Sequence, residues 1–144
     1  MTAYALAHLR PDGPPGEEVL DYIDGIQPTM DPYGGRFLVH NTPVEVMEGD
    51  WPGALVVLEF PTIEAARAWY ASPAYQELAP LRTRHIPGDL VLVDGVARDY
   101  DPRATAAALR AEAFPGHRIR GVADYTTDPV ARTLVPDPGG RKHG

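Results

Sequence analysis

The sequence predicts an α+β fold in which two helices alternate with four strands. Two segments repeat apolar residues at helical spacing, and four short segments are rich in aliphatic and β-branched residues. Turns rich in glycine and proline separate these segments. The resulting order, β-α-β-β-α-β, is the ferredoxin-like motif, whose antiparallel sheet has the strand order fourth, first, third, second and whose helices cover one face.

The first half of the chain supplies a strand, a helix and a second strand. Tyr4–Leu9 is the first predicted strand and ends in a turn-rich segment. A helix follows from Glu17, with acidic residues in its first turn, and it is expected to end before Pro28. Arg36–His40 is the second predicted strand, which Val44–Met47 continues after a bulge.

The second half completes the motif. Ala54–Phe60 is almost continuously apolar, as expected of a central strand covered on both faces. Thr62 is the expected N-cap of the second helix, which Ser72 and Pro73 interrupt, and a short helix over Tyr75–Leu81 follows. Leu90–Val93 is the fourth strand. Because the strands are apolar on both faces, we expect a second copy of the sheet or a ligand to cover the open face, and predict a homodimer.

The charge distribution places a boundary near residue 95. Residues 1–95 hold 5 basic and 14 acidic residues, whereas residues 96–144 hold 8 basic and 6 acidic ones. We therefore predict a ferredoxin-like domain over residues 1–96 and a C-terminal extension over 97–144. The extension is expected to contain a helix over about 102–114, a possible strand over 118–125 and a disordered end. A lid, a dimer arm and a docking segment are all consistent with it.

Composition excludes several classes of function. The net charge of -7 argues against nucleic acid as a partner, and the chain has no apolar run of membrane-spanning length. The absence of cysteine excludes disulfides, thiolate metal sites and a cysteine nucleophile. We expect a cytoplasmic protein of one domain that needs no cofactor and no metal.

Four separated motifs resemble a known bacterial family. They are the segments Gly34–Val39, Glu48–Trp51, Glu59–Pro61 and Trp69–Gln76, the last followed by Leu81 and Arg82. Together they resemble the family called domain of unknown function 1330, over about residues 2–96. The resemblance implies a dimeric α/β barrel, a superfamily that includes oxygenases, isomerases, lyases and simple binding proteins. His40 and His85 depart from the family pattern.

Four titratable residues are candidates for catalysis. We expect the first and third strands to run parallel, so that His8 and Glu59 lie at the same end of the sheet, and the neighbouring strands bring His40 and His85 there. Imidazole and carboxylate groups in a half-apolar cavity suit general acid-base catalysis. The same cluster is also consistent with a metal site, although no short-spaced pair of ligands is present.

Five further residues are candidates for substrate binding. The guanidinium groups of Arg36 and Arg82 suit a carboxylate or phosphate, and Ser72 and Tyr75 carry hydroxyls able to donate hydrogen bonds to it. Trp51 lies in a predicted turn and is expected at a pocket rim or a dimer contact.

The sequence therefore predicts a small-molecule enzyme that acts by acid-base chemistry without a cofactor. Isomerisation, cyclisation or elimination on a carbonyl-bearing and possibly anionic substrate fits these residues. A non-catalytic small-molecule binding protein, a cofactor-free monooxygenase and an interaction protein that docks through its extension are the alternatives. Alanine, arginine and proline are abundant and lysine occurs once, which is typical of GC-rich bacteria and suggests secondary metabolism as a setting.

Overall fold

A computed structural model describes residues 1–113. Residues Met1–Arg98 form one compact unit, and the chain from Asp99 onward belongs to a second unit, of which helix α5 (Pro102–Ala113) is described. Asp101 caps this helix, since its carboxylate accepts a hydrogen bond from the backbone N–H of Arg103 at 2.9 Å. The expected strand at 118–125 and the expected disordered end lie outside the described residues.

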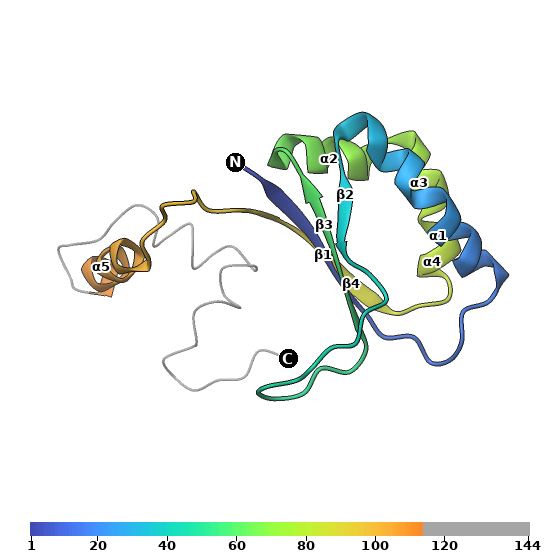
Figure 1. Cartoon of the computed structure of the whole chain (residues 1–144), viewed down its shortest axis with the longest axis horizontal. Helices are drawn as coiled ribbons and strands as arrows, with labels where there is room; N and C mark the ends of the chain where they lie inside the picture. The colour runs from blue at the N-terminus through green and yellow to red at the C-terminus, as the bar shows by residue number, and fades with distance from the viewer. Residues whose placement is uncertain (114–144) are drawn as a thin grey trace. The chain divides into compact units, whose positions relative to one another are not determined.

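The first unit is a four-stranded sheet with helices on one face (Figure 1). The strands are β1 (Ala3–Leu9), β2 (Arg36–Val39), β3 (Ala54–Phe60) and β4 (Gly88–Asp94), in the order β2-β3-β1-β4. The helices are α1 (Glu17–Met30), α2 (Ile63–Ala71), α3 (Pro73–Leu78) and α4 (Pro80–Thr83), and a 3-10 turn, η1 (Asp31–Tyr33), follows α1. This order and topology confirm the α+β, ferredoxin-like fold.

The strand directions correct one prediction. β1 and β3 pair antiparallel, with His8 opposite Leu55 and Tyr4 opposite Glu59. The helical crossover makes β2 parallel to β1, and the return from β2 makes β3 antiparallel to both. His8 and Glu59 therefore lie near opposite ends of the sheet, and the expectation that they share one end is wrong.

Two element boundaries also differ from the prediction. Helix α1 continues through Pro28 to Met30, because Met30 is fully buried in the core and its packing outweighs the hydrogen bond that proline cannot donate. Val44–Met47 is not a strand. The pairing of β2 with β3 stops at Val39, with its irregularity between Phe37 and Val39, and Met47 is 82% exposed.

The helical segment after β3 is divided by its prolines. Thr62 is the N-cap of α2, as predicted, because its side chain accepts a hydrogen bond from the backbone N–H of Ala65 at 3.0 Å. Ser72 caps α3 in the same way, through the N–H of Tyr75. A single helix over Tyr75–Leu81 was expected, but α3 ends at Leu78 and Pro80 begins α4. Proline favours the first position of a helix, where no N–H is needed.

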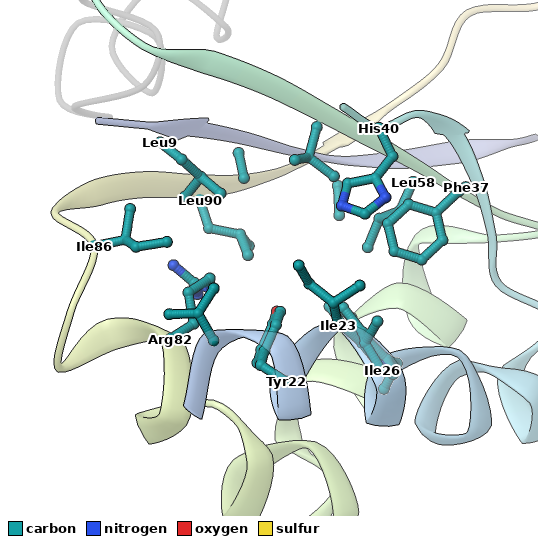
Figure 2. A pocket seen from close by; sticks show the side chains of 15 residues that line it. Leu9, Tyr22, Ile23, Ile26, Phe37, His40, Leu58, Arg82, Ile86 and Leu90 are labelled. Carbon is teal, nitrogen blue, oxygen red and sulfur yellow. The ribbon is translucent and has the colours of Figure 1, made fainter. Parts of the chain in front are cut away.

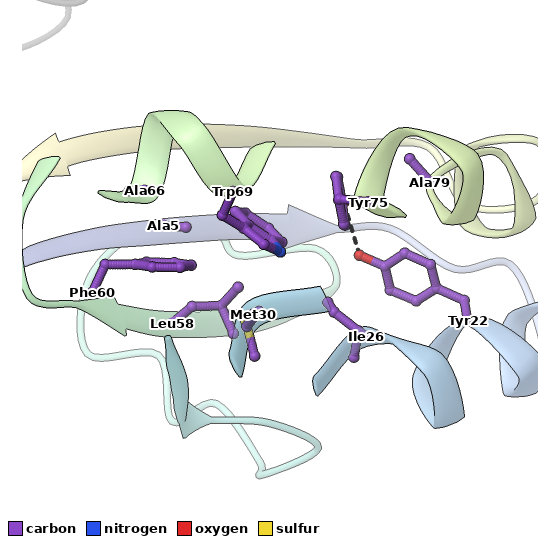
Figure 3. Close-up of a cluster of buried hydrophobic side chains, with 10 residues drawn as sticks. All are labelled: Ala5, Tyr22, Ile26, Met30, Leu58, Phe60, Ala66, Trp69, Tyr75 and Ala79. Carbon is purple, nitrogen blue, oxygen red and sulfur yellow. Dashed lines mark hydrogen bonds between the residues drawn. The ribbon is translucent and has the colours of Figure 1, made fainter. Parts of the chain in front are cut away.

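The core lies between the sheet and the helices (Figure 3). Phe60, Trp69, Met30 and Tyr75 are its largest fully buried side chains. The buried residues that the central strand β1 contributes to this layer are all alanines, at positions 3, 5 and 7. Because alanine fills little volume, this arrangement leaves space between β1 and helix α1.

The other face of the sheet carries no helix of this unit (Figure 1). Leu38, Val91 and Val93 are 40%, 47% and 43% exposed there, beside the half-buried Leu6 and Val57. We call this surface the open face. It is an apolar surface with charged residues at both ends, of the kind expected at an interface between proteins.

Candidate functional site

A cavity of about 80 Å³ lies between the covered face of the sheet and helix α1 (Figure 2). Ala5 and Ala7 of β1 contribute to its walls, so the small residues of the central strand create its space. The volume is several times the roughly 10–15 Å³ that one water needs. Of the 15 side chains that line the cavity, only four carry a polar group: Tyr22, His40, Trp69 and Arg82.

Arg82 is the charged group of the cavity. It is 8% exposed, and its Nη2 donates a hydrogen bond of 3.4 Å to the hydroxyl of Tyr75. Its guanidinium also lies over the ring of Tyr22, 5.4 Å from the centroid. Within residues 1–113, no carboxylate forms a salt bridge with it. Arg82 is therefore a buried cation for which the described chain supplies no counter-charge.

The surroundings keep Arg82 charged and Tyr22 neutral. Burial acts most strongly on the pKa of Arg82 and lowers it, but the hydrogen bond to Tyr75 and the proximity of Tyr22 outweigh burial and raise the pKa overall. Burial, followed by the neighbouring Tyr75, raises the pKa of Tyr22. The two tyrosine hydroxyls are 2.9 Å apart and share a hydrogen bond (Figure 3). Tyr22 therefore stays protonated and does not act as a base.

His40 lies across the cavity from Arg82 (Figure 2). It directly follows β2, and its imidazole packs on Phe37 with ring centroids 4.7 Å apart. Arg82 lies on the side of β4, next to Ile86 and Leu90 (Figure 2). His40 is exposed and also lines an open depression outside the cavity, so it lies at the mouth.

His85 lies at the edge of this depression, on the surface. Its Nε2 is 2.7 Å from Oε1 of Glu18, and Arg84 lies 3.5 Å from the other oxygen of the same carboxylate. These contacts, led by the hydrogen bond to His85, lower the pKa of Glu18. They connect helix α1 to the segment after α4, and His85 does not line the cavity itself.

His8 lies on the open face, away from the cavity. Its Nε2 donates a hydrogen bond of 2.6 Å to the carbonyl oxygen of Pro52, and its ring stacks on Trp51 with centroids 4.1 Å apart. These contacts hold the connection between β2 and β3 against the end of β1. Trp51 is therefore no part of the cavity rim, and its role as a dimer contact stays a prediction.

Glu59 and Arg36 also lie on the open face. Glu59 Oε1 accepts a hydrogen bond of 2.9 Å from Nε of Arg36, which is its neighbour on β2. The four residues predicted for catalysis are thus divided. His8 and Glu59 lie near opposite ends of the open face. His40 lies at the mouth of the cavity, and His85 lies at the edge of the depression outside it.

The hydroxyls predicted for ligand binding have structural partners. Ser72 donates to the carbonyl oxygen of Trp69 and caps α3, and the fully buried Tyr75 bonds to Tyr22 and Arg82. The sequence reasoning missed Phe37 and Tyr22, which reach the cavity. It also missed the row of alanines in β1, although alternating small residues in a central strand are a visible signal of space beside it.

Two kinds of feature are absent from residues 1–113. Within residues 1–113, no helix is both long and apolar enough to cross a membrane. No group of three His, Asp or Glu side chains in that same part of the chain is placed to hold a metal ion.

The fold and the cavity define a class of protein: a ferredoxin-like α+β domain with an apolar pocket under its helices and a single buried cation inside. The particular family is also clear. Residues 2–96 match the family described as domain of unknown function (DUF1330), and the chain belongs to that family. This confirms the resemblance seen in the sequence. No curated protein matches.

Two solved structures with a similar chain trace are described as proteins of unknown function or uncharacterised proteins. The RPA0582 protein of unknown function from Rhodopseudomonas palustris is 16% identical, covers 67% of this chain and 83% of its own, and has a TM-score of 0.48. An uncharacterised NIPSNAP domain protein from Burkholderia xenovorans is 16% identical, covers 70% of this chain and 100% of its own, and has a TM-score of 0.42. These comparisons assign no catalytic activity.

Proposed function

We propose that the cavity binds a small organic acid with one carboxylate and an apolar tail, and that the guanidinium of Arg82 binds the carboxylate. The observation that carries this proposal is a buried guanidinium in an apolar cavity, with no acidic partner among residues 1–113. Burying an unpaired charge is costly, and proteins normally pair such groups. A ligand carboxylate would supply the missing partner and accept two parallel hydrogen bonds from the guanidinium.

Charge balance favours a monocarboxylate over a phosphate or a dicarboxylate. One carboxylate neutralises one guanidinium, whereas a doubly charged group would leave a net negative charge among apolar side chains. Tyr22 is held neutral by burial, and where Tyr75 is the donor in their shared hydrogen bond, the Tyr22 hydroxyl can donate to the same carboxylate. Apart from His40 and Trp69, the remaining walls are hydrocarbon and suit an apolar tail.

The test compares hexanoate with hexanamide, which has the same tail and no charge. Trp69 lines the cavity, so its fluorescence in the Trp51→Phe background, where it is the sole tryptophan, reports binding. We expect hexanoate to bind more tightly than the amide, and Arg82→Gln to weaken hexanoate binding at least about tenfold. Arg84→Gln is the matched control, because Arg84 lies outside the cavity. Equal affinity of the acid and the amide would refute the proposal.

Acid-base catalysis is the second candidate, and the presence of His40 at the same cavity favours it. An imidazole that faces a bound carbonyl-bearing acid is placed to accept a proton from the carbon next to the carbonyl, as isomerisation and elimination require. The predicted pairing of His8 with Glu59 no longer supports this chemistry. Exchange of protons of the bound acid with deuterated water that occurs in the wild type and is lost in His40→Gln would support catalysis. Binding without any exchange would indicate a binding protein with no catalytic activity. Cofactor-free oxygenation stays an untested alternative.

We also propose that a second copy of the chain covers the open face. Leu38, Val91 and Val93 present an apolar surface, and each end of that surface carries both signs of charge. Arg10 pairs with Asp89 at one end, and Arg36 pairs with Glu59 at the other. Identical surfaces with balanced charges meet without net repulsion in a two-fold dimer.

A further inference from the structure

The aromatic side chains of the cavity are the starting point for a more specific assignment of the ligand. Four of the lining residues carry aromatic rings, namely Tyr22, Phe37, His40 and Trp69. Phe37 and His40 form a pair at the side of β2, with ring centroids 4.7 Å apart and an angle of 35° between the rings. The opposite side, near β4, holds Arg82 (Figure 2).

We infer that the ligand is an aryl-alkanoic acid, whose aromatic ring packs against Phe37 and His40 while its carboxylate binds Arg82. This inference rests on the proposed carboxylate binding at Arg82 and adds the chemical class of the tail. An aromatic ring in contact with other rings gains attraction beyond the burial of its surface, through offset or edge-to-face contacts. A saturated ring of similar shape gains burial alone.

The separation of the two recognition groups requires a spacer in the ligand. β2 and β4 are the outer strands of the sheet, so their backbones are roughly 14 Å apart, three strand intervals. His40 follows β2, and Arg82 reaches into the cavity from helix α4, near β4 (Figure 2). We therefore infer that a short spacer separates the carboxylate of the ligand from its ring. The walls between the two ends are aliphatic and include Val56 and Leu58, which suits a short methylene chain.

The test compares two matched series of acids. Phenylacetate, phenylpropanoate and phenylbutanoate form one series, and their cyclohexyl counterparts form the other. The ratio of phenyl to cyclohexyl affinity is measured in the wild type and in Phe37→Leu, so that differences in general hydrophobicity cancel. We expect this ratio to fall about fivefold in Phe37→Leu, at the spacer length that binds best.

Two further variants complete the design. Leu38→Ala is the matched control, because Leu38 lies beside Phe37 in sequence but on the open face, and it should leave the ratio unchanged. His40→Leu removes the second ring at an exposed position and gives an independent reading if Phe37→Leu folds poorly. The ratio should fall in His40→Leu as well.

The outcomes separate this inference from the proposal on which it rests. If both series bind and both lose affinity in Arg82→Gln, but the ratio is the same in wild type, Phe37→Leu and His40→Leu, the aromatic assignment is overturned and carboxylate binding stands. If no acid of either series binds, both are overturned. A reduced ratio in the two ring variants, with the control unchanged, supports the aryl-alkanoic acid.

Discussion

Replacing Arg82 with methionine distinguishes a binding arginine from a structural one. Methionine keeps most of the length and volume of the arginine stem and removes the charge. If Arg82 is present for a ligand, Arg82→Met should abolish carboxylate binding without lowering the free energy of unfolding. If Arg82 is a structural residue, the same change should destabilise the domain.

The structure allows the size of the effect to be worked out. The hydrogen bond from Arg82 to Tyr75 is long, 3.4 Å, and is expected to contribute at most about 1 kcal/mol. The cation-π contact with Tyr22 adds about 0.5–2 kcal/mol. Burial of the unpaired guanidinium opposes both at an effective cost of several kcal/mol. Burial raises the pKa of Tyr22, so at neutral pH its hydroxyl brings no negative charge to offset that of Arg82.

We therefore expect Arg82→Met to unfold in urea with a free energy equal to that of the wild type, within about 1 kcal/mol, or higher. The hydroxyls of Tyr22 and Tyr75 remain hydrogen-bonded to each other in the variant, so the loss of the guanidinium leaves neither hydroxyl without a partner. Arg84→Met, at an exposed position, is the control and should change stability by less than about 0.5 kcal/mol. A loss above about 2 kcal/mol in Arg82→Met alone would refute the reasoning.

Three further predictions concern other parts of the molecule. Tyr75→Phe removes the hydroxyl that bonds to Tyr22 in the core and should lower the free energy of unfolding by about 1–3 kcal/mol. Each kcal/mol should lower the melting temperature by about 4–8 °C. Tyr70→Phe, at the surface, is the control and should leave the melting temperature unchanged. Val93→Glu places a charge on the open face and should convert a dimer into a monomer in analytical ultracentrifugation; an unchanged assembly would exclude that face as the interface. The lowered pKa of Glu18 means that its contact with His85 stabilises the fold above the ordinary carboxyl pKa of 4.5 and that this stabilisation is lost as the pH falls through the lowered value. Glu18→Gln should therefore lower the melting temperature near pH 7 but not near pH 3, and an equal difference at both would contradict the sign.

The sequence predicted the fold well because local pattern and topology agree. The helical spacing after Glu17, the cap at Thr62 and the apolar run of β3 each point to the element that forms. The predicted ends of two elements were wrong, because packing and strand pairing, rather than local sequence, determine where these elements end. Helix α1 passes Pro28 because Met30 is buried beyond it. Val44–Met47 has β-branched residues but pairs with no strand within residues 1–113.

The candidate site was only partly predictable, because its position depends on which face each side chain occupies. Side chains alternate between the faces of a strand, so Ala7 faces the cavity while His8, the next residue, faces the opposite side. Because β3 runs antiparallel to β1 and not parallel, Glu59 also lies at the other end of the sheet from the predicted one. Arg82 was identified by its chemistry and its motif, but its lack of an acidic partner within residues 1–113 became visible only in the structure.

The most direct measurement of the central claim is native mass spectrometry of the full chain, purified without a tag, as wild type and as Arg82→Gln. The account predicts that the wild type retains an organic acid with one carboxyl group, which is released on denaturation and identified by its mass. It predicts that Arg82→Gln, prepared from the same cells, retains none of it. Retention of the same compound by both proteins, or of a neutral compound by the wild type, would contradict the assignment of Arg82 as the group that binds the ligand.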